Sequence, residues 1–180
     1  MLAPQLNLYV PSGDFLRANS GFRTRFGVAA GLQAAILIRP TRRGGVILHG
    51  FWAQPNSNAT VPGPDGYFGR NSSRVSGLGA QLAWYARLRP GSALLFAAGP
   101  TLFRQTIWDR PKPDTWNHSS SWGLSTTAQF QYRLGTKVHW LLGATYQTYH
   151  SDVDAIPGDT QDPSLQQHEI LMSTGLGFGL

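Results

Sequence analysis

The chain has 180 residues, which is the size of one domain, and only 13% of them are charged, about half the share usual in a soluble domain. Two lysines, Lys112 and Lys137, and one glutamate, Glu169, argue against a surface that faces mainly water. The net charge of +6 comes from 13 arginines, and their spread along the chain, without one basic patch, argues against nucleic-acid binding.

No run of about 18 apolar residues occurs, which excludes a transmembrane helix. A closed β-barrel is the other structure that pairs every backbone N–H and C=O group in lipid. The first residues, 1–4, lack the charged and apolar regions of a signal peptide. Because an outer-membrane protein needs such a peptide, we expect it to have been removed before residue 1. The absence of cysteine is compatible with an oxidising compartment.

Alternating polar and apolar residues, which are typical of strands with one exposed face, recur along the whole chain. In chain order the expected strands are residues 5–10, 22–39, 46–54, 74–89, 93–108, 122–134, 137–150 and 168–180. Short turns at 40–45, 90–92 and 135–136 alternate with long loops at 11–21, 55–73, 109–121 and 151–167. An even strand number with short turns at one end and long loops at the other is typical of membrane barrels. We therefore predict an all-β fold, an eight-stranded antiparallel up-and-down transmembrane β-barrel, with residues 1–180 as its single domain.

The two faces of the expected strands differ in composition. One face is apolar and includes Leu82, Phe130 and Leu142, whereas the other includes Gln129 and Gln131 among Gly, Ser and Arg residues. A soluble barrel of the lipocalin type would bury the apolar face and expose a surface with almost no Lys or Glu. Glycines, by contrast, suit the crowded interior of a narrow barrel. The apolar face is therefore predicted to contact lipid.

Aromatic residues lie towards both ends of the expected strands. The long-loop end has Trp52, Trp108, Trp122 and Tyr146, and the short-turn end has Trp84, Tyr132, Trp140 and Phe178. Amphipathic rings prefer the level of the lipid headgroups, so this distribution predicts two aromatic girdles. The alternative is that aromatic residues are simply common in strands.

The end of the chain carries a recognisable pattern. Ser173, Gly175, Phe178 and Leu180 fit a polar residue, a glycine and two apolar or aromatic residues at alternate positions. This pattern resembles the terminal assembly signal of bacterial outer-membrane barrels, although those proteins most often end in an aromatic residue. In its architecture the whole chain resembles small eight-stranded bacterial outer-membrane β-barrel proteins (OmpA/OmpX-like architecture). That resemblance implies an integral outer-membrane location in a Gram-negative bacterium and insertion by the barrel-assembly machinery.

The polar face is expected to form a network inside the lumen. Its predicted members are Arg23, Arg25, Gln81, Arg87, Gln129, Gln131, Arg133 and Glu169. A buried guanidinium needs an acceptor, so we predict that Glu169 contacts Arg23, Arg25 or Arg104 near the long-loop end. A structural role, in which the network plugs and stiffens the barrel, is favoured over a functional site. Any residual pore would prefer anions because basic groups outnumber acids in the lumen.

The two ends of the expected barrel differ in charge. All eight Asp residues lie in the long loops or at their edges. The short-turn end carries Arg39, Arg42, Arg43, Arg87, Arg89, Arg133 and Lys137. Such a cationic rim suits contact with phospholipid phosphates of the inner leaflet. The equally weighted alternative is that these are ordinary polar turn residues.

An enzyme alternative rests on a second resemblance. Lipid A 3-O-deacylases are eight-stranded barrels with a His-x-Ser motif at the end of strand 7 and a Glu on strand 8. His150, Ser151 and Glu169 occupy similar places here and would be the catalytic residues. However, His150 and Ser151 are adjacent, so a regular strand directs them to opposite faces. We therefore assign no catalytic residues.

The favoured hypothesis is a non-enzymatic integral barrel with a structural or protein-interaction role through its long loops. The alternatives are a lipid A-modifying hydrolase and a narrow anion-preferring pore. The expected partners are membrane lipid and lipopolysaccharide, the barrel-assembly machinery during insertion, and a protein bound by the loops. The acidic stretch 151–162 lacks the regular spacing of a calcium loop, so no metal site and no cofactor are predicted.

Overall fold

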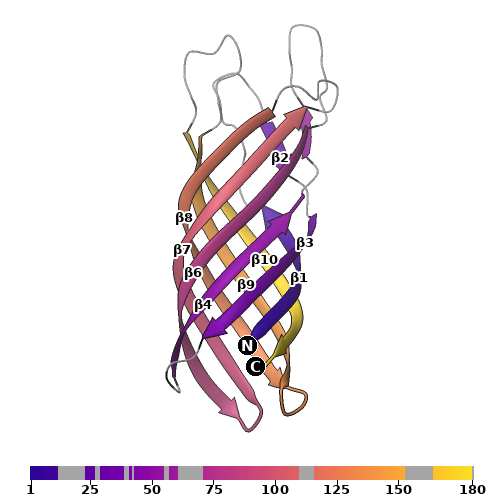
Figure 1. Cartoon of the computed structure of the whole chain (residues 1–180). Helices are drawn as coiled ribbons and strands as arrows, with labels where there is room; N and C mark the ends of the chain where they lie inside the picture. The colour runs from indigo at the N-terminus through magenta and orange to yellow at the C-terminus, as the bar shows by residue number, and fades with distance from the viewer. Residues whose placement is uncertain are drawn as a thin grey trace, which may run out of the picture.

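The computed structural model describes residues 1–11, 23–26, 29–38, 41, 43–54, 57–60, 71–109, 116–152 and 164–179. The strands in these ranges are β1 Leu2–Pro11, β2 Arg23–Phe26, β3 Ala29–Ile38, β4 Gly44–Ala53, β5 Ser57–Thr60, β6 Asn71–Arg89, β7 Ser92–Asp109, β8 Trp116–Arg133, β9 Val138–Asp152 and β10 Ser164–Phe178. Eight strands close a barrel in the order β1-β10-β9-β8-β7-β6-β4-β3, and β2 pairs with β5 (Figure 1). All strand pairs are antiparallel, so the predicted eight-stranded up-and-down barrel is confirmed.

The strand ends differ from the sequence-based prediction at the long-loop end. β8 begins at Trp116 rather than at residue 122, and its first residue pairs with Trp108 of β7. Residues 57–60 form β5, although they were expected to lie within a loop. These segments are polar and carry no alternating apolar pattern. Backbone hydrogen bonds do not need such a pattern, so strands can continue where no lipid covers them.

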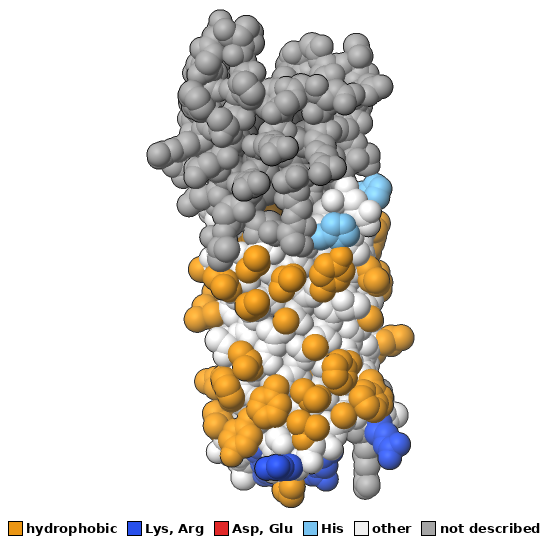
Figure 2. All heavy atoms as spheres, turned by 180° about the vertical axis from the view of Figure 1, so that it is seen from behind, with side chains coloured by type: hydrophobic (Ala, Val, Ile, Leu, Met, Phe, Trp, Pro, Cys, Tyr) orange, Lys and Arg blue, Asp and Glu red, His pale blue; other side chains and the backbone are white. Residues whose placement is uncertain are grey.

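Burial alternates along the barrel strands as predicted. Leu82 and Trp122 on the outer face are 76% and 68% exposed, whereas Gln81 and Glu169 on the inner face are 2% and 1% exposed. Figure 2 shows apolar side chains spread over the outer face, with Lys and Arg gathered at one end. A monomeric protein in water rarely exposes so much contiguous apolar surface. The orientation predicted from the sequence, with the apolar face outward and the polar face inward, is confirmed.

Two prolines interrupt the hydrogen-bond ladders without breaking the barrel. The β6–β7 ladder omits the pairings between Thr101 and Ala98, where Pro100 lies. Proline has no N–H group to donate, which explains the local gap. Beside it, Gly99 lies so close to the backbone of Ala80 that a Cβ atom would overlap it. A similar gap surrounds Pro4 in the β1–β10 ladder.

The short turns have the local chemistry that tight connections need. Pro90 and Gly91 join β6 to β7, and Gly91 has a φ of 87°. Proline followed by a residue with positive φ is the pattern of a type II turn, in which glycine avoids strain. In the turn between β3 and β4, the Gly44 amide donates to Thr41 Oγ1 at 2.8 Å. These connections fix the register of the strands that they join.

Candidate functional site

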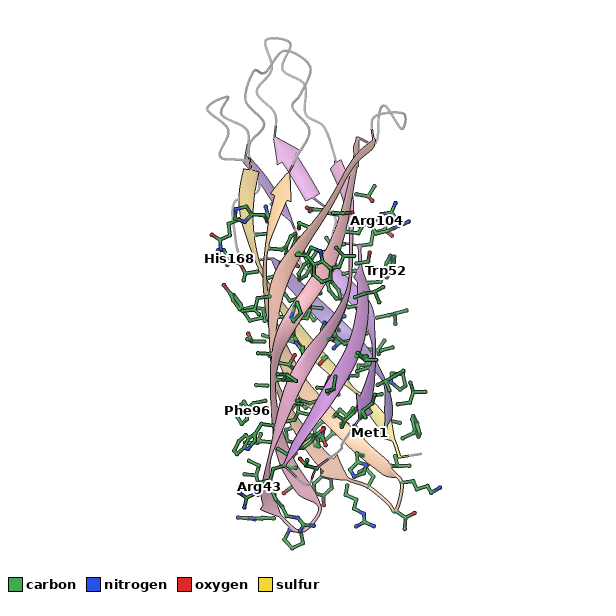
Figure 3. All side chains as sticks on the ribbon, turned by 60° about the vertical axis from the view of Figure 1, so that its left-hand side comes forward. Met1, Arg43, Trp52, Phe96, Arg104 and His168 are labelled. Carbon is green, nitrogen blue, oxygen red and sulfur yellow. The ribbon has the colours of Figure 1, made fainter. Side chains whose placement is uncertain are left out.

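The lumen is filled by side chains arranged in layers along the barrel axis (Figure 3). Towards the short turns lies an apolar cluster of Ala3, Ala35, Leu37, Ile47, Ala83, Tyr85, Leu95, Ala97 and Leu141, with Met1 packed against it. Towards the long loops lies a second cluster of Tyr9, Ala29, Phe51, Ala53, Val75, Phe103, Tyr149 and Leu171. Between the two clusters lie buried polar side chains, among them His49, Gln81, Thr101, Ser125 and Gln129.

A chain of glutamines crosses the lumen between β8 and β1. Gln131 Nε2 donates to Gln129 Oε1 at 3.2 Å, and Gln129 Nε2 donates to Gln5 Oε1 at 3.3 Å. Since β9 and β10 separate β8 from β1 in the barrel wall, the bond from Gln129 to Gln5 reaches across the lumen. Gln129 and Gln131 are members of the predicted polar network, and both are buried.

Hydroxyl groups extend the polar layer around Gln81. Its Nε2 donates to the carbonyl oxygen of Ser125 at 3.1 Å, and its Oε1 accepts from Thr127 Oγ1 at 3.1 Å. Ser125 Oγ also lies 2.7 Å from Thr101 Oγ1, which is 3.4 Å from His49 Nε2. The cavity inside this layer has a volume of about 20 Å³, enough for about one water molecule. The polar layer therefore closes the lumen within the described strands.

Glu169 lies at the centre of the layer nearest the long loops. Its Oε1 accepts hydrogen bonds from the hydroxyl groups of Tyr9 and Tyr149, the latter at 2.6 Å. Tyr149 stacks on Phe103 with ring centroids 4.2 Å apart. The three strands involved, β1, β9 and β10, are neighbours in the barrel. The carboxylate is thus held by tyrosine hydroxyls inside an aromatic cluster.

Of the three arginines expected to contact Glu169, Arg104 does not do so. Arg104 lies on the outer face of β7 (Figure 3), whereas Glu169 is buried in the lumen. The alternation of β7 explains this result, because the buried residues Phe103 and Gln105 flank Arg104 on the inner face. The side chains of the other two expected partners, Arg23 and Arg25, lie outside the part that the structure describes.

The remaining arginines of the predicted network lie at the barrel mouth. Arg87 and Arg133 are on inward-facing positions but are exposed at the short-turn end. Arg133 Nε donates to the carbonyl oxygen of Gly135 at 2.9 Å. Together with Arg43 and His139 they line a cavity of about 860 Å³. Their inward orientation agrees with the prediction, but both lie at the mouth of the barrel, beside the filled part of the lumen rather than within it.

The geometry does not assemble the residues of the enzyme alternative. His150 is exposed on the outer face of β9 and pairs with Gln166, whereas Glu169 is buried in the lumen and pairs with Gln147. A carboxylate that orients a catalytic histidine must contact its ring, and the barrel wall separates these two groups. The side chain of Ser151 lies outside the described residues.

The aromatic residues expected in the girdles lie on the outer face. Those exposed are Trp52, Trp84, Trp122, Tyr132, Trp140, Tyr146 and Phe178, while the side chain of Trp108 is not among those described. Several of their polar atoms are paired: Trp140 Nε1 donates to Thr174 Oγ1 at 3.1 Å, and the Tyr146 hydroxyl lies 2.6 Å from His168 Nδ1. Trp84 stacks on Phe96 with centroids 6.1 Å apart.

The terminal pattern falls on β10. Ser173 is buried in the lumen, Gly175 faces inward beside Gln5, and Phe178 is exposed on the outer face as the last strand residue. β10 ends at Phe178, whereas the sequence analysis expected a strand to residue 180; Leu180 lies outside the described residues.

A closed antiparallel barrel with an apolar outer face, a filled lumen, and short turns at one end is the architecture of small outer-membrane β-barrels. Among solved structures, the chain is similar to neisserial surface protein A (NspA), with a TM-score of 0.66 and 10% identity over 99% of this chain and 97% of that one. It is also similar to the outer-membrane protein OprG from Pseudomonas aeruginosa, with a TM-score of 0.68 and 11% identity over 98% of this chain and 93% of that one. At these identities the likeness establishes the fold.

No protein-family model matches the chain, and the search of curated proteins found no match either. The described residues include no helix of the length and apolar character needed to cross a membrane.

Proposed function

We propose that the protein is an integral barrel of the bacterial outer membrane that acts as a closed scaffold. Its role is structural, or it binds a protein partner through the long loops held at one end. The filled lumen carries this proposal, because two packed clusters and a polar layer occupy the space that a pore would need. The apolar outer face supports a location in lipid.

The partners that follow from this location are proposals of the same kind. Membrane lipid and lipopolysaccharide would surround the outer face, and the barrel-assembly machinery would recognise the terminal segment during insertion. A protein partner would bind the long loops. Co-purification from native membranes after chemical cross-linking would identify such a partner.

The narrow anion-preferring pore is the competing function. The hydrogen bonds from Gln131 through Gln129 to Gln5 cross the lumen, and the cavity beside them holds only about 20 Å³. This arrangement supports a scaffold over a pore. The lipid A hydrolase has no such support, because His150 and Glu169 lie on opposite faces of the wall.

Two measurements test the scaffold proposal. After expression in a Gram-negative host, the protein should fractionate with outer membranes and resist extraction by carbonate or urea. The purified barrel in a planar lipid bilayer should give a flat current trace across the usual voltage range. Recovery in the soluble fraction would contradict the membrane location, and stepwise anion currents would favour the pore instead.

A further inference from the structure

The cavity at the short-turn mouth has an unusual concentration of positive charge. Its wall includes Arg43 in the turn just before β4, Arg87 on β6, Arg133 on β8 and His139 on β9. Arg133 and His139 are direct cross-strand partners. These side chains come from three strands and one turn, and they line one cavity of about 860 Å³.

None of the described residues that line the cavity is an Asp or a Glu. The sequence around the three short turns, residues 39–45, 86–93 and 131–139, contains no Asp or Glu. Several guanidinium groups that share one cavity without a carboxylate repel each other, and an anion relieves that repulsion. Planar guanidinium groups present paired N–H donors that match the oxygens of a phosphate. The chemistry of the cavity therefore suits a phosphate group.

The cavity also opens sideways through the barrel wall. The β4–β6 ladder ends with the pairing of Gly44 and Trp84 and the hydrogen bond from the Tyr85 amide to the Arg43 carbonyl oxygen. Between this point and the short turn, residues 86, 87 and 89 of β6 pair with β7, and among the described strands none of them pairs with β4. Consequently the cavity is lined both by inward-facing Arg87 and by outward-facing Trp84. It connects the lumen mouth to the lipid-facing surface.

We call the opening between Arg87 and Trp84 the notch. Its outer side is apolar and therefore suits acyl chains. Trp84 is 52% exposed and stacks on Phe96, and Leu82 follows further along the same face. Figure 3 shows Phe96 above Arg43 at this end of the barrel. Aromatic side chains at headgroup level commonly mark the border between the polar and apolar parts of a bilayer. A lipid could thus place its phosphate among the arginines while its chains remain on the apolar face.

We propose that the notch beside Arg43, Arg87 and Arg133 binds the phosphate of a phospholipid headgroup from the periplasmic leaflet. The inference rests on the membrane location proposed above and adds a specific lipid site to it. A free phosphate ion could enter through the end of the barrel alone. The side opening onto the apolar face therefore favours a phospholipid over a free anion.

Native mass spectrometry of the purified barrel, titrated with phosphatidylglycerol in detergent micelles, tests the site. The wild-type barrel should retain a bound lipid, and the double variant Arg87→Gln/Arg133→Gln should weaken binding at least about tenfold. The control is Arg104→Gln, which removes one positive charge from the outer face near the opposite end and should leave binding unchanged. The variant Arg87→Lys/Arg133→Lys keeps the charge but loses the planar donors, and it should show an intermediate loss.

Competing inorganic phosphate separates the two sources of the anion. Phosphate at millimolar concentration should displace little of the lipid, because it lacks the contacts with the apolar face. Arginine-dependent binding of inorganic phosphate without retention of lipid would overturn the lipid assignment. Equal lipid binding by wild-type and double variant, both with the circular dichroism of a folded barrel, would overturn this inference alone. A wild-type chain that stays in the soluble fraction would overturn it together with the proposed function.

Discussion

Glu169 shows what a single buried group contributes at the residue scale. One of its oxygens accepts hydrogen bonds from two tyrosine hydroxyls that are themselves buried. A hydroxyl left without an acceptor in such a place costs more free energy than the bond itself contributes. The cluster therefore ties β1, β9 and β10 together near the long-loop end.

Two substitutions of Glu169 should show how much of the stability depends on an acceptor oxygen at this position. Glu169→Ala removes the acceptor for Tyr9 and Tyr149, and we expect the free energy of unfolding to fall by about 2–4 kcal/mol. Glu169→Gln retains a carbonyl oxygen and should lose less than half as much. Urea titration in detergent micelles, followed by tryptophan fluorescence, measures both values. Identical stability of the alanine variant and the wild type would show that the tyrosines do not depend on this acceptor.

The residues of this cluster illustrate which contacts a sequence can predict. Because Glu169 is the only glutamate in the chain, the sequence alone indicates it as a member of the lumen network. Its partner Tyr9 lies 160 positions away, and the two meet only because β1 and β10 close the barrel in a particular register. Period-2 alternation assigns Tyr149 to the inner face, but it cannot show which inward residues meet across the lumen. The contacts of Glu169 with Tyr9 and Tyr149 were therefore not predicted, and an arginine was expected as its partner.

At the scale of the strand, alternation carried most of the prediction. The rows around Leu82, Phe130 and Leu142 follow a strict period of two, and each lies on the outer face as expected. The ends of strands were harder to place because polar segments such as residues 116–121 extend β8 without an apolar pattern. Lipid imposes that pattern only where it touches the barrel.

A charge on the row of outward-facing residues that includes Leu82 tests the prediction that lipid contacts this face. Leu82→Lys puts an ammonium group in the middle of the outer face of β6, where we expect a loss of stability of about 2–4 kcal/mol. Ser120→Lys is the matched control, because Ser120 is also exposed but lies in the polar extension of β8. Reversible unfolding in lipid vesicles, monitored by circular dichroism, gives both values. Equal effects at the two positions would argue against lipid around Leu82.

At the scale of the whole molecule, the first and last strands must pair for the barrel to exist. Leu8 on β1 pairs with Met172 on β10, and both side chains lie on the exposed outer face. This seam joins opposite ends of the chain, so it reports closure of the complete barrel. The chain has no cysteine, which leaves a clean background for cross-linking.

A cysteine pair across the seam should therefore form a disulfide. We expect Leu8→Cys/Met172→Cys to oxidise readily and to change mobility on a non-reducing gel, because the paired Cα atoms lie within disulfide range. In the control Leu8→Cys/Leu176→Cys, the second position is four residues along β10, about 13 Å from the partner of Leu8. That pair should stay reduced. Efficient cross-linking of the control, or none in the first pair, would contradict the register of the seam.

The polar extension of β8 has a consequence for electrostatics outside the bilayer. Trp116, where the strand starts, lies six positions before Trp122, one of the aromatic residues at the long-loop end. At about 3.3 Å per residue and a tilt of about 40°, these six steps raise the end of the strand by about 15 Å. This height exceeds the screening length of about 8 Å at physiological ionic strength. Asp109 ends β7 directly after Trp108, the cross-strand partner of Trp116, so it is largely shielded from repulsion by the negatively charged leaflet beneath it.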